Sequence, residues 1–469
     1  MSTRSRAAAM AARADGPGEE RQASRDERAS LMARLRNFGH LVTGGIANAA
    51  IMLVGAVVAA RALGPEVFGV LTLVIALART AERVLRFESW QPLIRYAAKI
   101  ESGDADAHGD PSGDLGRLFA FGIWLDVGAA GLAALIAVAA ATAFGELAGL
   151  PEDGALLVAI YALALMVNWS GMPAAVLRLS GRFRLMAYYQ LAASLLRVAL
   201  ALGLWAMDAG LVAFVAAWTL TQGLNSLLLT WLALRCLGER GIAMPWRVSP
   251  GSIPGRFPGF IRFAFSTSLS SSLRTLTVEA DVLLVGALAG SSAAGFYYIA
   301  KRLAKVAQQV GVHVQSVLYP DIARMWSSER FEAFRRTTSQ MQAVLALVGG
   351  LLLAGVWLVG EPALRIAFGA DYAAAYPLFL TQVVAAIFVL HAAPARSALL
   401  AMNRPHAVLM TMLAGTIVFF ALAALLVPRM GALGASLAHV VLAAFVAIVL
   451  ETIIRRANPA RRAQGASAG

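Results

Sequence analysis

The sequence predicts an all-α, polytopic membrane protein with 12 transmembrane helices, arranged as two pseudo-symmetric six-helix bundles around a central cavity. Three observations support this fold class. The 469-residue chain is 59% hydrophobic and only 14% charged, with a mean hydropathy of +0.68. Apolar runs of about 20 residues, the length that spans a hydrocarbon core, recur along almost the whole chain. A weak internal repeat then divides these runs into two sets of six.

Turn residues and charges separate the apolar runs, and each run is long enough for one crossing. The second and eighth are the least hydrophobic, and Pro173 and Pro394 are expected to kink the helices that contain them. The predicted helices of the first half are 41–60, 67–91, 118–144, 154–178, 186–207 and 210–235. Those of the second half are 260–288, 293–319, 341–360, 373–395, 406–427 and 431–454.

The segments outside these runs complete the predicted domain organisation. Residues 1–36 are rich in Ala, Arg, Ser and acidic residues and have no apolar core, which predicts a disordered cytosolic tail and not a signal peptide. The N-terminal bundle then covers 37–237 and the C-terminal bundle 259–455. Between them, 238–258 contains Pro, Gly and Arg and is expected to be a cytoplasmic linker. Residues 456–469 form a second cytosolic tail.

The distribution of Lys and Arg predicts the orientation in the membrane. One set of connections, which includes both termini, carries 29 of the 40 basic residues. The opposite set carries only Arg61, Arg365 and Arg429. Basic residues accumulate on the cytoplasmic side of bacterial membrane proteins. Both termini are therefore expected in the cytoplasm of a bacterium, with the chain in its inner membrane.

Several function classes are disfavoured by what the sequence lacks. Cys236 is the single cysteine, so no disulfide within the chain is possible, and the six histidines have no metal-ligand spacing. No phosphate-binding glycine loop precedes a lysine, and the basic residues lie between apolar segments and not on a nucleic-acid-binding face. The outer connections near 145–153 and 361–373 are too short to hold a catalytic centre. We therefore expect no enzyme activity, no cofactor, no metal and no nucleic-acid partner.

The internal repeat aligns residues 61–84 with 287–310 at a shift of 226. Gly64 meets Gly290, Gly69 meets Gly295, and Arg79 meets Lys305. Because each half has six crossings, the two halves have the same orientation in the membrane. This predicts a pseudo-two-fold axis along the membrane normal, with a cavity between the halves.

Three arginines lie along one face of the second predicted helix. At 100° per residue, Arg79, Arg83 and Arg86 fall within an arc of roughly 60°. Each arginine at the bilayer centre costs at least ~2.5–3.5 kcal/mol on insertion scales. Three of them on a lipid-exposed face would offset much of a domain's net stability. We therefore expect this face to lie against protein or water.

The eighth predicted helix repeats this pattern, with Lys301, Arg302 and Lys305. Two cationic helices at equivalent positions of the repeats predict a positively charged cavity that suits an anionic substrate. The same cavity is expected to include Arg274. Glu82, Glu279 and Asp281 are candidates either for ion coupling or for structural ion pairs. Asp281 and Arg302 lie at similar predicted depth, as do Glu279 and Lys305.

Four stretches carry a resemblance to a known family. The chain resembles the oligosaccharide flippase branch of the multidrug/oligosaccharidyl-lipid/polysaccharide (MOP) exporter superfamily, over nearly all of 35–455. The resemblance implies a V-shaped pair of bundles that moves an undecaprenyl-pyrophosphate-linked glycan to the periplasmic leaflet, for lipopolysaccharide O-antigen, capsule or exopolysaccharide. Membrane lipids and the polysaccharide polymerase and chain-length machinery are the implied partners. The stretches are "ARALGPEVFGVLTLVIAL" (60–77), "FESWQPLIRYA" (87–97), "ADVLLVGALAGSSAAGFYYIAKRL" (280–303) and "FGADYAAAYPLFL" (368–380).

Other functions stay open at this point. A multidrug or cation antiporter of the same superfamily would need an apolar or acidic cavity, and the cationic helices disfavour it. A lipid II flippase usually carries two further C-terminal helices, which this sequence does not show. A membrane-embedded glycan polymerase or ligase would need a large outer loop. A scramblase or an assembly partner is compatible with the same pattern.

Overall fold

The computed structural model describes the 469-residue chain except residues 1–16, 87–88, 103–110, 243–245, 247–258 and 458–469. Within the helices, the side chains of 17–38, 40–42, 111, 263, 266–278, 307 and 310–320 also lie outside the described part. The described residues form helices joined by short turns, without a strand. The all-α prediction is therefore confirmed for this part of the chain.

The helices follow the predicted order along the chain. Those of the first half are α2 (Pro17–Leu85), α3 (Trp90–Glu101), α4 (Pro111–Phe144), α5 (Gly154–Met166), α6 (Gly171–Leu179), α7 (Phe183–Ala206) and α8 (Leu211–Glu239). Those of the second half are α9 (Phe260–Ala289), α10 (Ser291–Ser327), α11 (Phe331–Phe368), η3 (Ala370–Ala375), α12 (Tyr376–Ala401), α13 (Pro405–Met430) and α14 (Ala432–Ala457).

The start of the chain and the second crossing differ from the prediction. Helix α2 already begins at Pro17, where the sequence analysis expects a disordered tail, because Ala-, Glu- and Arg-rich residues with high helix propensity lead directly into the apolar run. At Gly64, with φ 73° and ψ 170°, α2 turns back on itself, so it contains two crossings. Its second arm ends at Leu85 and not at 91, and α3 follows as a separate helix.

The fourth crossing is broken, where a continuous helix over 154–178 was expected. Helix α5 ends at Met166 and α6 begins at Gly171, before Pro173. The side chain of Asn168, in the gap, donates to Glu82 at 2.7 Å and accepts from the hydroxyl of Ser226 at 3.1 Å. A proline cannot donate to the carbonyl four residues before it and clashes with it, and for Pro173 this is the carbonyl of Trp169 in the gap. The backbone N–H of Met172 donates to Asp126 at 2.8 Å instead of continuing the helix, so the kink expected at Pro173 occurs as a break.

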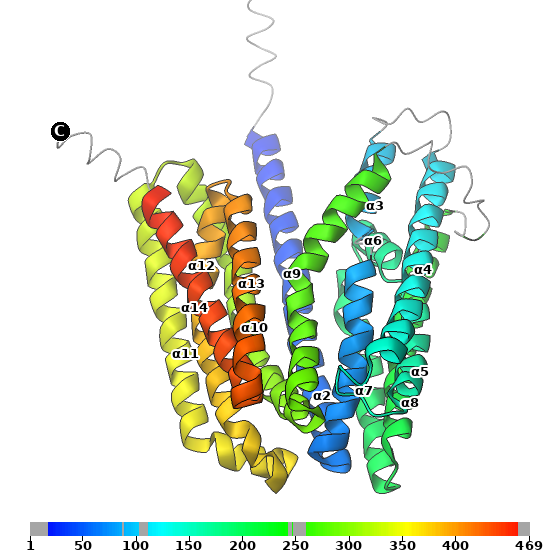
Figure 1. Ribbon diagram of the computed structural model, residues 1–469. Coiled ribbons are helices and arrows are strands. Elements are labelled where there is room, and N and C mark those ends of the chain that lie inside the picture. Colours follow the sequence, from blue (N-terminus) through cyan, green and yellow to red (C-terminus); the bar gives the residue numbers. More distant parts are fainter. Residues whose placement is uncertain (1–16, 87–88, 103–110, 243–245, 247–258, 458–469) are drawn as a thin grey trace, which may run out of the picture.

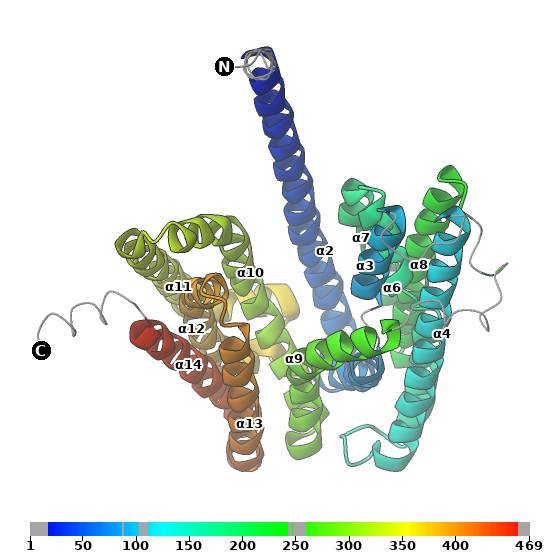
Figure 2. The same cartoon turned by 90° about the horizontal axis from the view of Figure 1, so that it is seen from above.

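The helices form two groups (Figure 1). Helices α3 to α8 lie on one side and α10 to α14 on the other, and Figure 2 shows α2 and α9 between them. The groups lie closest at the end that carries the turns at Gly64 and Gly290, and diverge towards the start of α2 and the end of α14. Helix α9 bridges them, since Phe260 in its first turn packs against Tyr96 and Phe121 with ring centroids 5.4 and 5.0 Å apart.

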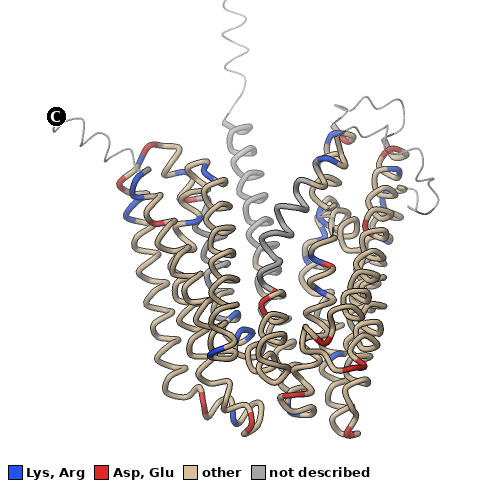
Figure 3. The backbone as a smooth tube through the Cα atoms, viewed as in Figure 1, with Lys and Arg blue, Asp and Glu red and all other residues tan. Residues whose placement is uncertain are grey.

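Nine helical segments of the described residues are long and apolar enough to cross a membrane. One of them, Thr43–Glu101, contains the turn at Gly64, and neither α9 nor α10 is among the nine. Lys and Arg gather towards the end of the molecule where α2 starts and α14 ends (Figure 3). The chain is a multi-pass membrane protein, and its 12 crossings and cytoplasmic termini stay predictions.

The internal repeat is visible where the two groups touch. Gly290, between α9 and α10, has φ 87° and ψ 173°, nearly the conformation of Gly64. Gly69 packs on the backbone of Ser291, and Gly295 packs on Pro65 and on Gly69 itself. Because 291 and 65 are also related by the shift of 226, the two close approaches are the same contact made twice. The approximate two-fold axis therefore passes by Gly69 and Gly295.

Aromatic residues pack beside this glycine contact. The ring of Phe68 lies 6.0 Å from that of Tyr298 and 6.5 Å from that of Tyr372. The hydroxyl of Tyr372 donates to the backbone carbonyl of Ala60 at 3.2 Å, from the second half to the first. We call the glycine contact and these rings the closed junction.

Candidate functional site

The best-defined ion pair beside the closed junction joins Lys301 to Asp281. The ammonium of Lys301 lies 2.7 and 2.6 Å from the two carboxylate oxygens, and Asp281 is only 1% exposed. The hydroxyl of Tyr297 donates to the same carboxylate at 2.9 Å, and the backbone N–H of Val282 at 2.7 Å. The carboxylate of Asp281 is thus fully satisfied, and a buried pair of this kind holds α9 against α10.

Arg302 does not pair with Asp281, although the two lie at similar depth in the sequence prediction. Lys301 and Tyr297 are four residues apart and share a face of α10, which is the face towards Asp281. Arg302, one residue further along, lies with Tyr298 on the neighbouring face of α10. Its guanidinium donates to the hydroxyl of Tyr298 at 3.2 Å. Similar depth therefore did not identify the partner of Asp281, because depth along a helix does not determine the direction of a side chain.

Two arginines of the first half approach this second face. Arg79, in the second arm of α2, has Tyr161, Glu279 and Tyr298 as its charged or polar neighbours. Arg197, in α7, is only 6% exposed and donates from Nε to the hydroxyl of Thr221 at 2.9 Å. Tyr161, Arg79, Tyr298 and Arg302 are the neighbours that dominate its electrostatic environment.

These residues form one group across the two halves of the protein. Lys305 is exposed and also belongs to this group, since Lys301, Glu279 and Arg302 are its charged neighbours. Five cations and two carboxylates leave a surplus of three positive charges in this group. We call it the cationic cluster, and it consists of Arg79, Arg197, Lys301, Arg302 and Lys305 with Glu279 and Asp281.

A second polar region lies inside the first half, beside the break between α5 and α6. Arg86 pairs with Glu82 at 3.2 Å, and Glu82 also accepts from Asn168. Asp126 of α4 accepts from the hydroxyl of Ser89 at 2.6 Å and from the backbone N–H of Met172 at 2.8 Å. These contacts all lie within one half of the molecule. We call this region the N-bundle polar site.

The arginine face of the second crossing is therefore divided between two regions. Arg79 joins the cationic cluster, Arg86 joins the N-bundle polar site, and Arg83 lies half-buried between them. The side chain of Arg274 lies outside the described residues. Arg197 was missed as a site residue, although an arginine within the apolar run "LAASLLRVALALG" is the signal that marks functional positions in membrane helices.

The described residues contain no group of three or more His, Cys, Asp and Glu that could hold a metal ion. The chemistry of the cationic cluster is instead that of anion binding. Guanidinium groups present several N–H donors in one plane and bind phosphate or carboxylate oxygens in pairs. The fold and this cluster define a class of protein: a multi-pass membrane protein of two helix bundles with a cationic cluster at their contact.

Comparison with known proteins identifies the family. The profile of the family described as "Polysaccharide biosynthesis protein" matches residues 58–377. Inner membrane protein YghQ of Escherichia coli is 26% identical over 352 residues, which cover 73% of this chain and 95% of that protein. Succinoglycan biosynthesis transport protein ExoT of Rhizobium meliloti is 29% identical over 120 residues, about a quarter of each chain. The chain belongs to the polysaccharide biosynthesis protein family.

Solved structures confirm the fold at low sequence identity. An inward-facing multidrug resistance MATE transporter of the MOP superfamily superposes with a TM-score of 0.70 at 13% identity, and covers 88% of this chain and 95% of its own. The lipid II flippase MurJ, in an inward closed conformation, gives a TM-score of 0.69 at 12% identity, and covers 88% and 87%. The predicted fold is therefore confirmed.

Proposed function

We propose that this protein flips a polyprenyl-diphosphate-linked oligosaccharide across the inner membrane for cell-surface polysaccharide biosynthesis. The observation that carries this proposal is the surplus of three positive charges at the contact between the two halves. An uncompensated cationic site inside a membrane protein is costly unless a counter-charge occupies it. The diphosphate of a lipid-linked glycan supplies that counter-charge.

The residues of the cluster have different roles in this proposal. Arg302 donates to the hydroxyl of Tyr298, and Arg79 lies near Tyr161 and Tyr298, which leaves N–H donors of both guanidinium groups for phosphate oxygens. Lys305 is exposed and can approach the same anion. Arg197 is buried behind Tyr161 and strengthens the positive field without needing to touch the ligand.

The location of the cluster fits the two ends of such a substrate. The diphosphate and sugars pass between the two halves, where the charged side chains lie, while the polyprenyl chain stays in the lipid outside the bundles. We expect both termini in the cytoplasm and transport towards the periplasmic leaflet. A polymerase that joins the delivered repeat units is the partner that this role requires.

The test is a transport assay with two cluster variants and a matched control. Arg79→Ala and Arg197→Ala should each reduce export of the lipid-linked glycan by about tenfold or more, because the first removes a charge-assisted contact with the diphosphate and the second removes part of the positive field around it. Arg365→Ala removes an exposed arginine that pairs with Glu361 within one turn of α11, and should export normally. Export is measured as surface polysaccharide in cells that depend on the variant, beside the amount of protein in the membrane.

Two results would contradict the proposal. Normal export from the double variant Arg79→Ala/Arg197→Ala would show that the surplus charge is not used. Efflux of cationic drugs by the wild-type protein, without accumulation of lipid-linked glycan in its absence, would instead support a multidrug antiporter.

A further inference from the structure

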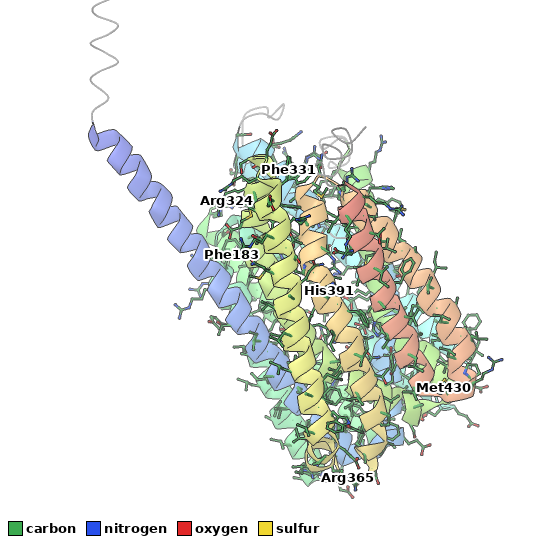
Figure 4. The ribbon with its side chains drawn as sticks, turned by 90° about the vertical axis from the view of Figure 1, so that its left-hand side faces the viewer. Phe183, Arg324, Phe331, Arg365, His391 and Met430 are labelled. Carbon is green, nitrogen blue, oxygen red and sulfur yellow. The ribbon has the colours of Figure 1, made fainter. Side chains whose placement is uncertain are left out.

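A pocket lies at the end of the molecule where α14 terminates, and no residue of the cationic cluster lines it. Its volume is about 760 Å³, within the range of small-molecule sites. It lies between the first turns of α11 and the last turns of α14, both of which pack on α12. Figure 4 shows these three helices next to one another, with Phe331 at the pocket end of α11.

The rim of this pocket is cationic. Arg335 and Arg336 of α11 and Arg455 of α14 line it, against two carboxylates, those of Glu332 and Glu451. Arg455 donates to Glu451 at 2.8 Å, and Gln342 donates to the other carboxylate oxygen at 2.9 Å, so the charge of Glu451 is compensated. Arg335 and Arg336 are exposed and form no ion pair with the described residues. Two guanidinium groups are therefore available to one anion.

The floor of the pocket is apolar and leads onto the membrane-facing surface. Phe334, Met402 and Ile454 are buried beneath the arginines, and Trp326 packs on Phe334 with ring centroids 5.2 Å apart. Further along the same helices, Leu347 of α11 is 65% exposed and Ile448 of α14 is 63% exposed. A free anion uses the rim alone, whereas a lipid uses the rim with its headgroup and the apolar surface with its acyl chains.

We propose that this pocket binds the phosphate headgroup of an anionic phospholipid from the leaflet at which α14 ends. Arg335 and Arg336 bind the phosphate, and the acyl chains lie along α11 and α14. Basic pockets between helices at the membrane surface recognise anionic lipids in this way, because cationic side chains and apolar surface meet at the depth of the headgroups. The site is separate from the cationic cluster and does not depend on the proposed transport function.

The experiment measures lipids retained by the purified full-length protein in native mass spectrometry. Phosphatidylglycerol, phosphatidylcholine and inorganic phosphate are titrated in separate arms. The wild-type protein should retain phosphatidylglycerol, and Arg335→Gln/Arg336→Gln should weaken that binding about tenfold or more through the loss of two charge-assisted contacts. Arg324→Gln is the matched control, since Arg324 is an exposed arginine that pairs with Asp321 outside the pocket and should bind as the wild type does.

A second variant tests whether binding needs the space of the pocket as well as its charges. Ser339→Trp fills the pocket from α11 and leaves every arginine in place, and it should also weaken the binding of phosphatidylglycerol. Thermal unfolding of each variant in detergent checks that it is folded. Equal retention of phosphatidylglycerol by all variants overturns the proposal. So does equal affinity of the wild type for phosphatidylcholine, or displacement of the lipid by equimolar inorganic phosphate or polyprenyl diphosphate.

Discussion

Residues 61–84 and 287–310 are related by the internal repeat, yet they are alike in one part and different in another. Their glycines match, since Gly64 and Gly290 share a backbone conformation and Gly69 packs on Gly295. Their charges match only in part. Arg79 corresponds to Lys305, but Lys301 and Arg302 correspond to the apolar Ile75 and Ala76.

The matched glycines and the unmatched charges show that two different requirements act on the same pair of helices. Contact between two related halves is satisfied best by the same residues on both sides, because each half then meets the other in one geometry. A ligand without two-fold symmetry gains nothing from duplicated charges. The glycine contact is therefore symmetric, whereas the cations of the cationic cluster are not: two come from the first half (Arg79 and Arg197) and three from the second (Lys301, Arg302 and Lys305). Three predictions test this separation.

The largest effect is expected at the symmetric glycines. A side chain at residue 69 would overlap the backbone of Ser291, and one at 295 would overlap that of Pro65. Gly69→Leu and Gly295→Leu should each force the closed junction apart and reduce glycan export to background. Because the contact is the same on both sides, the two variants should be equally defective.

The control for this prediction is Gly203→Leu in α7, where an added side chain meets nothing within 4 Å. It should export as the wild type does. Unequal defects of the two junction variants, with equal amounts in the membrane, would show that the contact is not functionally symmetric.

The next effect concerns the asymmetric ion pair of Lys301. Lys301→Ala leaves the carboxylate of Asp281 buried without a cation, which should lower the free energy of unfolding by ~3–5 kcal/mol. Asp281→Asn in the same chain removes the stranded charge and should restore most of the loss. Thermal unfolding in detergent measures both. Arg365→Ala, which breaks an exposed pair, should cost at most about 1 kcal/mol.

If Lys301→Ala unfolds at the wild-type temperature, the pair does not stabilise the contact between α9 and α10. Failure of Asp281→Asn to compensate would show that the two residues do not act as a pair.

The smallest effect is expected from Arg79→Lys. The substitution keeps the positive charge but loses the planar fork that reaches both Tyr161 and a phosphate. Export should fall by less than about tenfold, the equivalent of 1.4 kcal/mol, and by less than in Arg79→Ala. Export equal to that of Arg79→Ala would show that geometry, and not charge, determines the role of this residue.

Most of the fold follows from local information in the sequence. Apolar length and turn residues predicted α7, α8, α9, α13 and α14 closely, since each lies between glycine, proline or charged turns. The helices α10, α11 and α12 extend six to ten residues beyond the predicted 293–319, 341–360 and 373–395. A kink at Pro173 was predicted, but the length of the break at 167–170 was not. The partners of Asn168 in this break, Glu82 and Ser226, lie 86 and 58 residues away and could not be predicted from local patterns.

The candidate site was predictable in composition but not in connectivity. The periodicity of α10 indicated that Lys301, Arg302 and Lys305 are near one another, but only the rotation of α10 against α9 decides which of them meets Asp281. In the same way, the arginine face of α2 indicated a polar environment without showing that Arg79 and Arg86 enter different ones. Arg197 joins Arg79 across 118 residues of chain, and local patterns contain no information on such a contact.

The membrane voltage acts on the charges of the cationic cluster, which lies beside the closed junction. The two halves touch at Gly69 and Gly295, and Arg79 follows Gly69 by ten residues. The cationic cluster therefore lies to one side of the closed junction. A surplus of three charges that crossed the full field would change its energy by about 7 kcal/mol per 100 mV. A bound diphosphate cancels most of that charge. We therefore expect the return of the empty protein to depend strongly on voltage, and the movement of the loaded protein to depend on it very little.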